Sequence, residues 1–420
     1  MNAIHDQLPG AEMRQEVLVM IPRINIHAFC TDPRTGQVLE TAAADRRMAK
    51  AHMQVHPGGI AAAAEIYSQT ETPNVLIVES QANRDGVLAE LAQLAAVCDP
   101  STKVIVIGHL NDVLLYRELT RLGISDYIVA PISSLQVIES VGNLYADPGA
   151  ARIGRVIAFA GARGGTGAST IAHNVAWTIA RTYALETTIV DLDVAFGTAA
   201  LDFNVDPNQS VADAFIQPDR IDEAVVDRLL MKVGERLNLL SAPSVVDREY
   251  PVERETLEHV IDVIRRSVPM VVLDLPSSWM PWSKSILTQA DEVVIVALPD
   301  LASLRNAKNM IDLLKAARPN DRPPILILNQ VGLQKRPEIP VTDFAKAAGV
   351  EPTMVIPFDA VTFGTASGNG KMVAEVNPKS KAAPLLAALA ERVAGRQPPP
   401  QPKAKLALPF VGKLSLMRKK

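Results

Sequence analysis

The sequence predicts two consecutive doubly wound α/β units, each a mainly parallel sheet with helices on both faces. Short apolar runs alternate with amphipathic helical patterns twice along the 420 residues, which is the pattern of parallel sheets. A glycine-rich turn follows the first apolar run of the second unit, where such a sheet would hold a ligand. Hydrophobic residues make up 48% of the chain but aromatic residues only 4%, a balance that suits close packing of helices on sheets.

The first unit is expected to span residues 21–147, after a loose polar arm at 1–20. The expected strands are Ile24–Phe29, Met53–Val55, Val75–Val78, Val104–Ile107 and Tyr127–Val129. The expected helices are Gln37–Ala51, Ile60–Tyr67, Asp85–Ala96, Asp112–Leu122 and Ser134–Tyr145. This regular order of strand and helix patterns predicts a flavodoxin-like sheet.

The second unit is expected to span residues 152–395, beyond a linker marked by Pro148 and Gly149. Its predicted strands are Val156–Ala160, Thr188–Val190, Leu237–Leu240, Met270–Leu273, Val293–Ala297, Ile325–Leu328 and Met354–Ile356. Its main predicted helices are Thr170–Thr182, Arg220–Met231, Glu253–Arg266, Ser283–Gln289, Leu301–Ala317 and Ala382–Ala394. Ligands of such sheets bind at the carboxyl ends of the strands, so we expect the functional residues there.

Composition argues against several classes of protein. The net charge is −4, so there is no overall attraction for nucleic acid and we expect no specific nucleic-acid partner. Cys30 and Cys98 lie far apart without metal-ligand spacing, which indicates a reducing compartment rather than disulfides. No apolar run approaches the ~18 residues of a membrane span, and the acidic N-terminal segment is unlike a signal peptide. We therefore expect a cytoplasmic protein.

The strongest functional signal is the segment RVIAFAGARGGTGAST at 155–170. An apolar strand leads into a turn and a helix that carry Gly164, Gly165, Gly167, Ser169 and Thr170. Small residues let the backbone approach a ligand, and converging N–H groups together with the helix dipole favour phosphate. An ordinary P-loop reads G-x-x-x-x-G-K-[ST], whereas Ala162 stands at the first glycine and Ala168 at the lysine. The alternative is a glycine turn that binds nothing.

Polar residues follow three later strands of this unit, where a sheet of this kind holds its ligands. Asp191 and Asp193 form a DxD pair after one strand, and Asp274 follows another. A carboxylate there can order the water shell of Mg²⁺, while the Ser169 hydroxyl ligates the metal. Asn329 ends a further strand with an amide that both donates and accepts. Each residue taken singly could instead cap a turn.

RGGTGAST resembles the deviant Walker A motif, KGGxGK[ST][ST], of the ParA/MinD ATPases. Arg163 stands at the signature lysine, Ala168 at the P-loop lysine, and IAHN follows at 171–174. In these features the chain is similar to the CpaE/TadZ branch, whose members assemble and position Tad (Flp) pili. The resemblance covers about residues 150–395, and that branch also carries a receiver-like domain on the N-terminal side.

The resemblance implies roles for individual residues. It implies ATP as the cofactor, with Mg²⁺ held by Ser169 and, through water, by Asp191 and Asp274. It also implies that Asp193 positions the attacking water and that Arg163 crosses a dimer interface to the partner's phosphates. Nucleotide contacts are implied for Gly164, Gly165, Thr166, Gly167, Ala168, Ser169, Thr170, Asn329 and Pro357.

Ala168 predicts weak catalysis. A lysine at this position stabilises the charge that develops on the transferred phosphate, and losing one such group commonly costs ~2.7–4 kcal/mol of barrier. Backbone amides, Ser169 and Mg²⁺ can still hold nucleotide, so we expect ATP binding with slow or absent hydrolysis. The Arg163 guanidinium suits a bidentate phosphate contact in a dimer; the alternative is a solvated loop charge.

The first unit resembles a response-regulator receiver domain that lacks the residues of its chemistry. That family needs an acidic pair after the first strand, an aspartate after the third, Ser or Thr after the fourth, and lysine before a proline after the fifth. The corresponding positions hold Cys30 with Asp32 nearby, Glu79, Gly108 and Ala130. We therefore expect a docking or dimerising module without aspartyl-phosphate chemistry. Glu79 either mimics a charged state or, as we expect, is a solvated residue at a strand end.

Residues 396–420 are expected to form a Pro-rich spacer followed by a basic amphipathic tail. Lysine and arginine alternate with leucine and phenylalanine, while Pro409 and Gly412 interrupt any continuous helix. Such a tail suits an anionic membrane surface or the groove of a partner. The alternative is a disordered basic tail that only keeps the protein soluble.

Together these features predict an ATP-binding localisation and assembly factor for a Tad (Flp) pilus or secretion apparatus. It would act as a nucleotide-dependent homodimer at the pole or the inner membrane surface, with pilus assembly proteins as partners. One alternative is an active ParA/MinD ATPase that serves DNA segregation, division-site selection or flagellar-number control. Another is a scaffold that binds no nucleotide.

Overall fold

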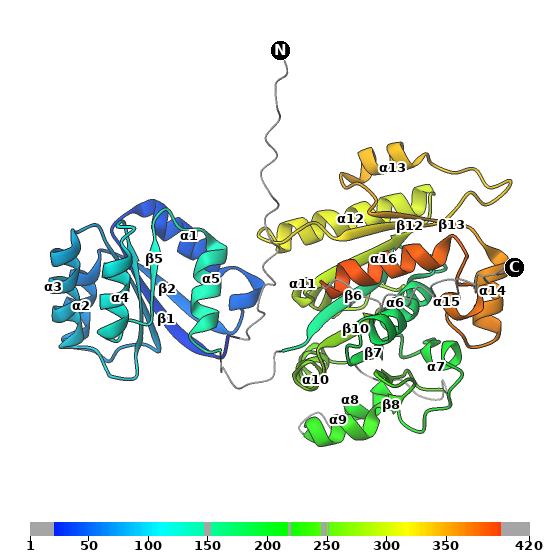
Figure 1. Ribbon diagram of the computed structural model, residues 1–420, viewed down its shortest axis with the longest axis horizontal. Helices are drawn as coiled ribbons and strands as arrows, with labels where there is room; N and C mark the ends of the chain where they lie inside the picture. Colours follow the sequence, from blue (N-terminus) through cyan, green and yellow to red (C-terminus); the bar gives the residue numbers. More distant parts are fainter. Residues whose placement is uncertain (1–20, 147–152, 217–219, 245–249, 251, 396–420) are drawn as a thin grey trace, which may run out of the picture.

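The computed structural model describes residues 21–146, 153–216, 220–244, 250 and 252–395. They form two sheets, one in an N-terminal unit (21–146) and one in a C-terminal unit (153–395), and helices cover both faces of each sheet (Figure 1). The predicted α/β fold class is confirmed. The predicted arm at 1–20, most of the linker, and the spacer and tail at 396–420 lie outside the described residues.

The N-terminal sheet has the strand order β2-β1-β3-β4-β5, and its strands are parallel. This is the flavodoxin-like order expected of a doubly wound sheet. The strands are β1 (Ile24–Cys30), β2 (Ala51–Pro57), β3 (Val75–Ser80), β4 (Lys103–Gly108) and β5 (Asp126–Val129). The helices are α1 (Pro33–Ala43), the short 3₁₀ helix η1 (Arg46–Met48), α2 (Ile60–Tyr67), α3 (Arg84–Ala95), α4 (Val113–Arg121) and α5 (Ser134–Asn143).

The C-terminal sheet has eight strands in the order β13-β12-β11-β6-β10-β7-β9-β8, and only β8 runs antiparallel to its neighbour. The strands are β6 (Arg155–Gly161), β7 (Thr187–Asp191), β8 (Met231–Lys232), β9 (Leu237–Leu240), β10 (Met270–Asp274), β11 (Glu292–Ala297), β12 (Ile325–Val331) and β13 (Met354–Pro357). Every residue of β10 is buried, as expected for a central strand with helices on both faces.

Long amphipathic helices cover this sheet, and short helices link them. They are α6 (Ala168–Thr182), α7 (Ala199–Asp202), α8 (Val211–Ile216), α9 (Glu223–Leu229), α10 (Arg254–Ser267), α11 (Ser283–Gln289), α12 (Leu301–Ala317), α13 (Val341–Ala348), α14 (Ala360–Gly368), α15 (Val373–Val376) and α16 (Ala382–Ala394). Among the described residues, none of these helices is both long enough and apolar enough to cross a bilayer.

Two predicted helices extend well beyond the helices of the structure, and local capping explains one of them. The prediction of one helix over Gln37–Ala51 is wrong because α1 ends at Ala43 and the Asp45 carboxylate caps η1 by accepting from Arg47 N. The chain then enters β2 at Ala51. The prediction of a helix over Arg220–Met231 is also too long, because Met231 pairs with Leu239 in the antiparallel strand β8.

At the carboxyl edge of the N-terminal sheet, the interpretation of Glu79 as a solvated residue is wrong. Its side chain is fully buried. The carboxylate accepts hydrogen bonds from Thr31 N (2.8 Å), Asp32 N (2.9 Å), Thr35 Oγ1 (2.9 Å) and His109 Nε2 (3.1 Å). Burial alone would raise the pKa of Glu79, but these hydrogen bonds outweigh it and hold the pKa below its usual value.

The structure also explains which residues stand at positions 32 and 108 on this edge. The Asp32 carboxylate accepts from Arg34 N and so caps α1 rather than facing a metal. A Cβ at Gly108 would collide with the ring of Tyr127, whose hydroxyl donates to Leu110 O at 2.8 Å. The Tyr127 ring therefore fills the space in which a side chain at position 108 would lie.

Replacing Glu79 by glutamine should lower the free energy of unfolding by about 1–3 kcal/mol, because the N–H groups of Thr31 and Asp32 lose a charged acceptor. The folded pKa of Glu79 is depressed, so its stabilisation is present above the unfolded pKa of about 4.3 and is lost as pH falls through the folded pKa. Urea unfolding at pH 7 and at acid pH measures both effects.

The matched control is Glu65→Gln, because Glu65 is exposed on α2. An equal effect of both substitutions at pH 7 would contradict this account of Glu79. So would a Glu79→Gln difference that persisted unchanged at acid pH.

Candidate functional site

The glycine-rich turn ends at the amino terminus of α6, which begins at Ala168 rather than at the predicted Thr170. Gly167 caps the helix with φ 82°, a left-handed conformation that favours glycine. In the described part of the chain, no side chain caps this helix, and the Ser169 and Thr170 hydroxyls make no hydrogen bond. A 15-residue helix therefore presents free N–H groups and its positive dipole end, which is the physical basis of anion binding.

Amide side chains from neighbouring elements hold the turn in shape. Asn329 Nδ2 donates to Thr166 O at 2.8 Å, and Gln330 Nε2 donates to Gly165 O at 3.1 Å. These two residues lie where the register of β12 against β13 shifts, an irregularity that can re-aim side chains. A Cβ at Gly167 would lie only 2.7 Å from Asn329 Nδ2. The predicted nucleotide contact Asn329 is thus a buried support of the turn, next to Gly167.

The three predicted carboxylates lie at this same edge of the sheet. Strand register pairs Asp191 with Asp274 directly, and both side chains are buried. Asp191 accepts from Asp193 N and Ala199 N, each at 3.1 Å. Burial and then the charge of Asp274 raise the pKa of Asp191 to about 7. Burial also raises the pKa of the half-buried Asp193, which accepts from Phe196 N at 3.1 Å.

His173 is a residue of this site that the sequence analysis did not single out. It comes from α6 and is fully buried. Its Nδ1 lies 2.7 Å from Asp202 Oδ2, and its Nε2 lies 3.3 Å from Asp274 Oδ2. Burial would lower the pKa of His173, but the two carboxylates outweigh it and raise the pKa to about 10. This histidine is part of the IAHN segment at 171–174, and no pattern in the sequence indicates its two carboxylate partners.

The donor set fits a magnesium ion held beside a phosphate. Asp274 Oδ1 is buried and has no hydrogen-bond partner among the described residues, so one carboxylate oxygen is left for an outside group. The Ser169 hydroxyl likewise has no hydrogen-bond partner among the described residues. A hydroxyl together with carboxylates that act through water is the oxygen set that Mg²⁺ takes beside phosphates.

The Arg163 side chain is bonded to residues of its own chain. Its guanidinium donates to Gly164 O at 3.0 Å and to Asp300 Oδ2 at 2.7 Å. Asp300 also caps α12 by accepting from Ser303 N at 2.8 Å. The predicted signature arginine is therefore an ion-paired residue here rather than a free loop charge. Pro357, the last predicted contact, ends β13 opposite Val331.

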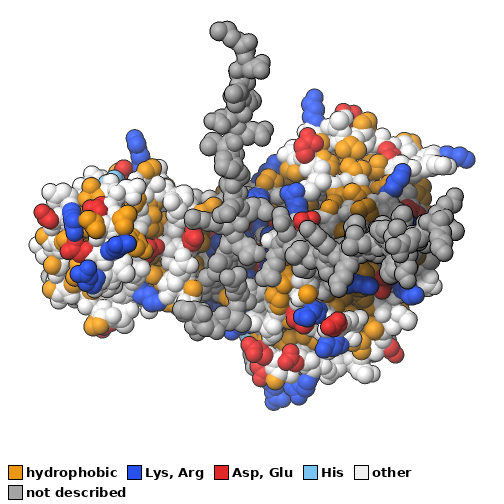
Figure 2. All heavy atoms as spheres, in the orientation of Figure 1, with side chains coloured by type: hydrophobic (Ala, Val, Ile, Leu, Met, Phe, Trp, Pro, Cys, Tyr) orange, Lys and Arg blue, Asp and Glu red, His pale blue; other side chains and the backbone are white. Residues whose placement is uncertain are grey.

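Large apolar side chains are exposed on segments that follow the strands at this edge. Figure 2 shows apolar patches among charged and polar side chains on the face in view. Two tryptophans follow β10, of which Trp279 is exposed and Trp282 is buried. The exposed apolar residues of these segments are Phe196, Leu201, Trp279, Leu301, Phe358 and Val361.

Known proteins match the two units separately. The family described as AAA domain matches residues 154–326. Septum site-determining protein MinD of Synechocystis is 25% identical over 163 residues, which are 39% of this chain and 60% of that protein. The chain thus spans about three fifths of that curated relative. MinD of Pyrococcus horikoshii, solved with Mg-ADP, matches at a TM-score of 0.50 and 22% identity, over 57% of this chain and 96% of that one, which shows the fold.

A different protein matches the N-terminal region. The solved pilus assembly protein CpaE of Caulobacter crescentus is 51% identical, and the match covers 97% of that chain and 30% of this one, with a TM-score of 0.30. This chain belongs to the CpaE family. The membership rests on the sequence identity across almost the whole of the solved CpaE chain. A CpaE-type N-terminal region thus precedes a ParA/MinD-type fold, which confirms the resemblance inferred from the motifs.

Replacing His173 by alanine should lower the free energy of unfolding by about 3–5 kcal/mol, because Asp274 and Asp202 lose their buried partner. Urea unfolding measures the change. His52→Ala is the matched control, since His52 is exposed on the edge strand β2. A loss no larger than that of the control would refute a charged pairing at His173.

Proposed function

We propose that this CpaE-family protein is an ATP-binding assembly and localisation factor of a Tad (Flp) pilus or secretion apparatus. In this proposal it works as a nucleotide-dependent homodimer with slow or absent hydrolysis, at the pole or the inner membrane surface. The observation that carries the proposal is the uncapped amino terminus of α6 beside the unpartnered oxygen of Asp274. Family membership supplies the pilus context.

The nucleotide roles proposed for this chain follow from that arrangement. The amides of residues 164–170 bind the phosphates, and Asn329 and Pro357 lie on the side of the base. Ser169 ligates Mg²⁺, and Asp191 and Asp274 order its water shell; when bound, the ion neutralises phosphate charge. Asp193 holds the attacking water. MinD of Pyrococcus horikoshii, which shares the fold, was solved with Mg-ADP.

Slow turnover is proposed because of the residue at 168. The Ala168 side chain is a buried methyl group, so the first turn of α6 supplies no ammonium group to the phosphates. The nearby cation Arg163 is engaged by Asp300. In the absence of a preorganised positive charge, a barrier higher by ~2.7–4 kcal/mol is expected.

The proposed dimer face is the carboxyl edge of the C-terminal sheet. Exposed apolar side chains lie on the segments that follow β7, β10, β11 and β13, at the same edge of the sheet as the glycine-rich turn. Burial of such surface favours association. The tail at 396–420 is proposed to contact a membrane surface or a pilus assembly partner, and residues 21–147 and 152–395 are proposed as separate domains.

A fluorescent ATP analogue should show saturable, Mg²⁺-dependent binding to the purified protein. Ser169→Ala should weaken binding roughly tenfold in Mg²⁺, because a metal ligand is lost, and should change it little in EDTA. Ser68→Ala, an exposed hydroxyl of the N-terminal unit, is the control. Absence of saturable binding to the wild-type chain would favour the nucleotide-free scaffold.

Replacing Asp300 by asparagine should raise the dimer fraction at a fixed concentration of ATP analogue by roughly two- to fivefold, since freeing Arg163 from an exposed pair releases up to about 1 kcal/mol. Asparagine still caps α12, so the fold should be kept. Analytical ultracentrifugation measures the dimer fraction.

Asp312→Asn, which breaks an exposed pair with Lys308 on the same helix, serves as the control. Arg163→Ala should lower the dimer fraction. If Asp300→Asn behaves like the control, the ion pair between Arg163 and Asp300 within one chain does not oppose dimer formation.

A further inference from the structure

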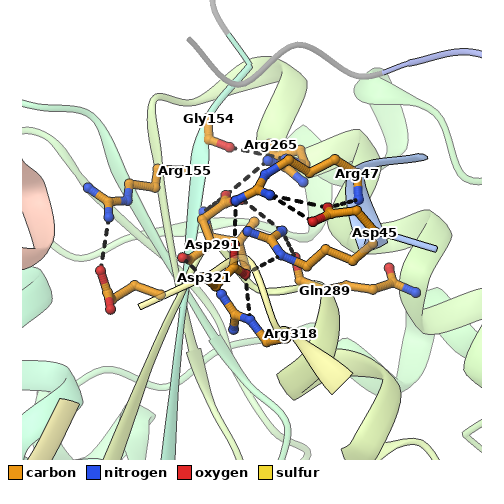
Figure 3. A network of polar contacts seen from close by, with 12 residues as sticks. Asp45, Arg47, Gly154, Arg155, Arg265, Gln289, Asp291, Arg318 and Asp321 are labelled. Atoms are coloured by element: carbon orange, nitrogen blue, oxygen red, sulfur yellow. Dashed lines mark hydrogen bonds and ion pairs between the residues drawn. The ribbon is translucent and has the colours of Figure 1, made fainter. Parts of the chain in front are cut away.

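A buried ionic cluster joins the two units at a place remote from the glycine-rich turn. The short helix η1 of the N-terminal unit meets the carboxyl ends of α10, α11 and α12 (Figure 3). Seven charged side chains take part, and none is more than 14% exposed. We call this cluster the clasp; it consists of Asp45, Arg46, Arg47, Arg265, Asp291, Arg318 and Asp321.

Arg46 is the central residue that the N-terminal unit contributes. Its Nε donates to Asp321 Oδ2 at 2.8 Å, and its Nη1 donates to Gln289 O at 2.9 Å and lies 3.5 Å from Asp291 Oδ1. Gln289 is the last residue of α11, so the guanidinium also satisfies a carbonyl at a helix end. One side chain thus contacts three residues of the C-terminal unit, one at the end of α11 and two in the loops that follow α11 and α12.

Neighbouring residues add contacts around Arg46. Arg47 pairs with Asp321 and with Asp45. Asn320 Nδ2 donates to Asp45 Oδ2 at 3.0 Å, so Asp45 is also bound across the junction. Lys50 forms a more exposed pair with Asp262 of α10 at 2.8 Å. The contact is therefore a surface with several directional bonds rather than one ion pair.

The carboxylates that receive Arg46 are held within the C-terminal unit itself. Asp291 accepts from Val156 N at 2.8 Å and from Arg265 Nη2 at 3.0 Å. Asp321 accepts from Arg318 Nε at 2.7 Å. Both acceptors are oriented by their own unit, so docking requires little ordering of side chains on that side.

We propose that the clasp fixes the N-terminal unit to the C-terminal unit, so that the two units move as one rigid body in solution. Separating the units would break the hydrogen bonds from Arg46, Arg47 and Asn320 across the junction, whose charged acceptors are already oriented. The planar guanidinium groups fit this network in a way that a lysine ammonium would not. Buried pairs are also screened little by salt, so the junction should persist at high ionic strength.

The position of the clasp decides which surface stays open. Asp291 precedes β11 and bonds Val156 at the start of β6, so the clasp lies at the amino ends of the strands. The glycine-rich turn lies at their carboxyl ends. The N-terminal unit is therefore held where it leaves the proposed nucleotide edge uncovered, and this inference does not depend on that edge binding nucleotide.

The test compares the full-length wild type with Arg46→Ala/Arg47→Ala. Small-angle X-ray scattering should show one compact particle for the wild type, at both 0.15 M and about 0.5 M salt, and a larger radius of gyration for the variant. Hydrogen exchange at residues 287–291 and 318–321 should become at least tenfold faster in the variant, while the core strands β3 and β10 keep their protection. Arg34→Ala, an exposed arginine on α1, should behave as wild type.

Two results would overturn the proposal. One is wild-type scattering that requires units moving independently. The other is a double variant with unchanged scattering and unchanged exchange at the clasp. If the double variant also loses protection in β3 and β10, the single variant Arg46→Lys takes its place, because lysine keeps the positive charge but lacks the planar guanidinium group. A larger radius of gyration and faster exchange at the clasp would then support the proposal, and wild-type values of both would overturn it.

Discussion

The constraint on which the site depends is the repulsion between two buried carboxylates on neighbouring strands. Parallel register places Asp191 directly beside Asp274, and burial strengthens their mutual repulsion because the local dielectric is low. The protein offsets it with the buried His173 and with backbone donors to Asp191. One oxygen of Asp274 is left without a partner. A divalent cation would offset this repulsion, so the arrangement of the two carboxylates suits a metal.

Much of the fold and of the candidate site could be predicted from the sequence, because these features depend on local sequence patterns. Alternating apolar strands and amphipathic helices predicted both sheets, and the spacing of Asp191, Asp193 and Asp274 placed them at one edge. The pairing of His173 with Asp202 and Asp274 could not be predicted, because it joins residues far apart in sequence through tertiary packing. The register shift that turns Asn329 and Gln330 toward the turn likewise has no signal in the sequence.

The wrong predictions, for Glu79 and for the helix over Gln37–Ala51, also arise from long-range contacts that a local pattern does not show. Glu79 lies at a strand end, where carboxylates are commonly solvated, and only the folded structure shows that four donors from the β1–α1 connection, α1 and the residue after β4 enclose it. The helix expected over Gln37–Ala51 was overextended because its apolar pattern runs on past the cap at Asp45. That cap belongs to the segment that also meets the C-terminal unit. In both cases the misjudged residue, Glu79 or Asp45, makes a hydrogen bond to a residue far away in the sequence.

The two outer strands of the large sheet bear on how copies of the chain can associate. At one border β8 has only two residues and ends in Lys232, and at the other β13 ends in Pro357, which has no N–H group. Short borders with lysine or proline offer few free backbone groups for strand addition. Growth of the sheet from one molecule into the next is therefore discouraged. The borders of this sheet therefore offer little template for the amyloid-like stacking of one copy on another.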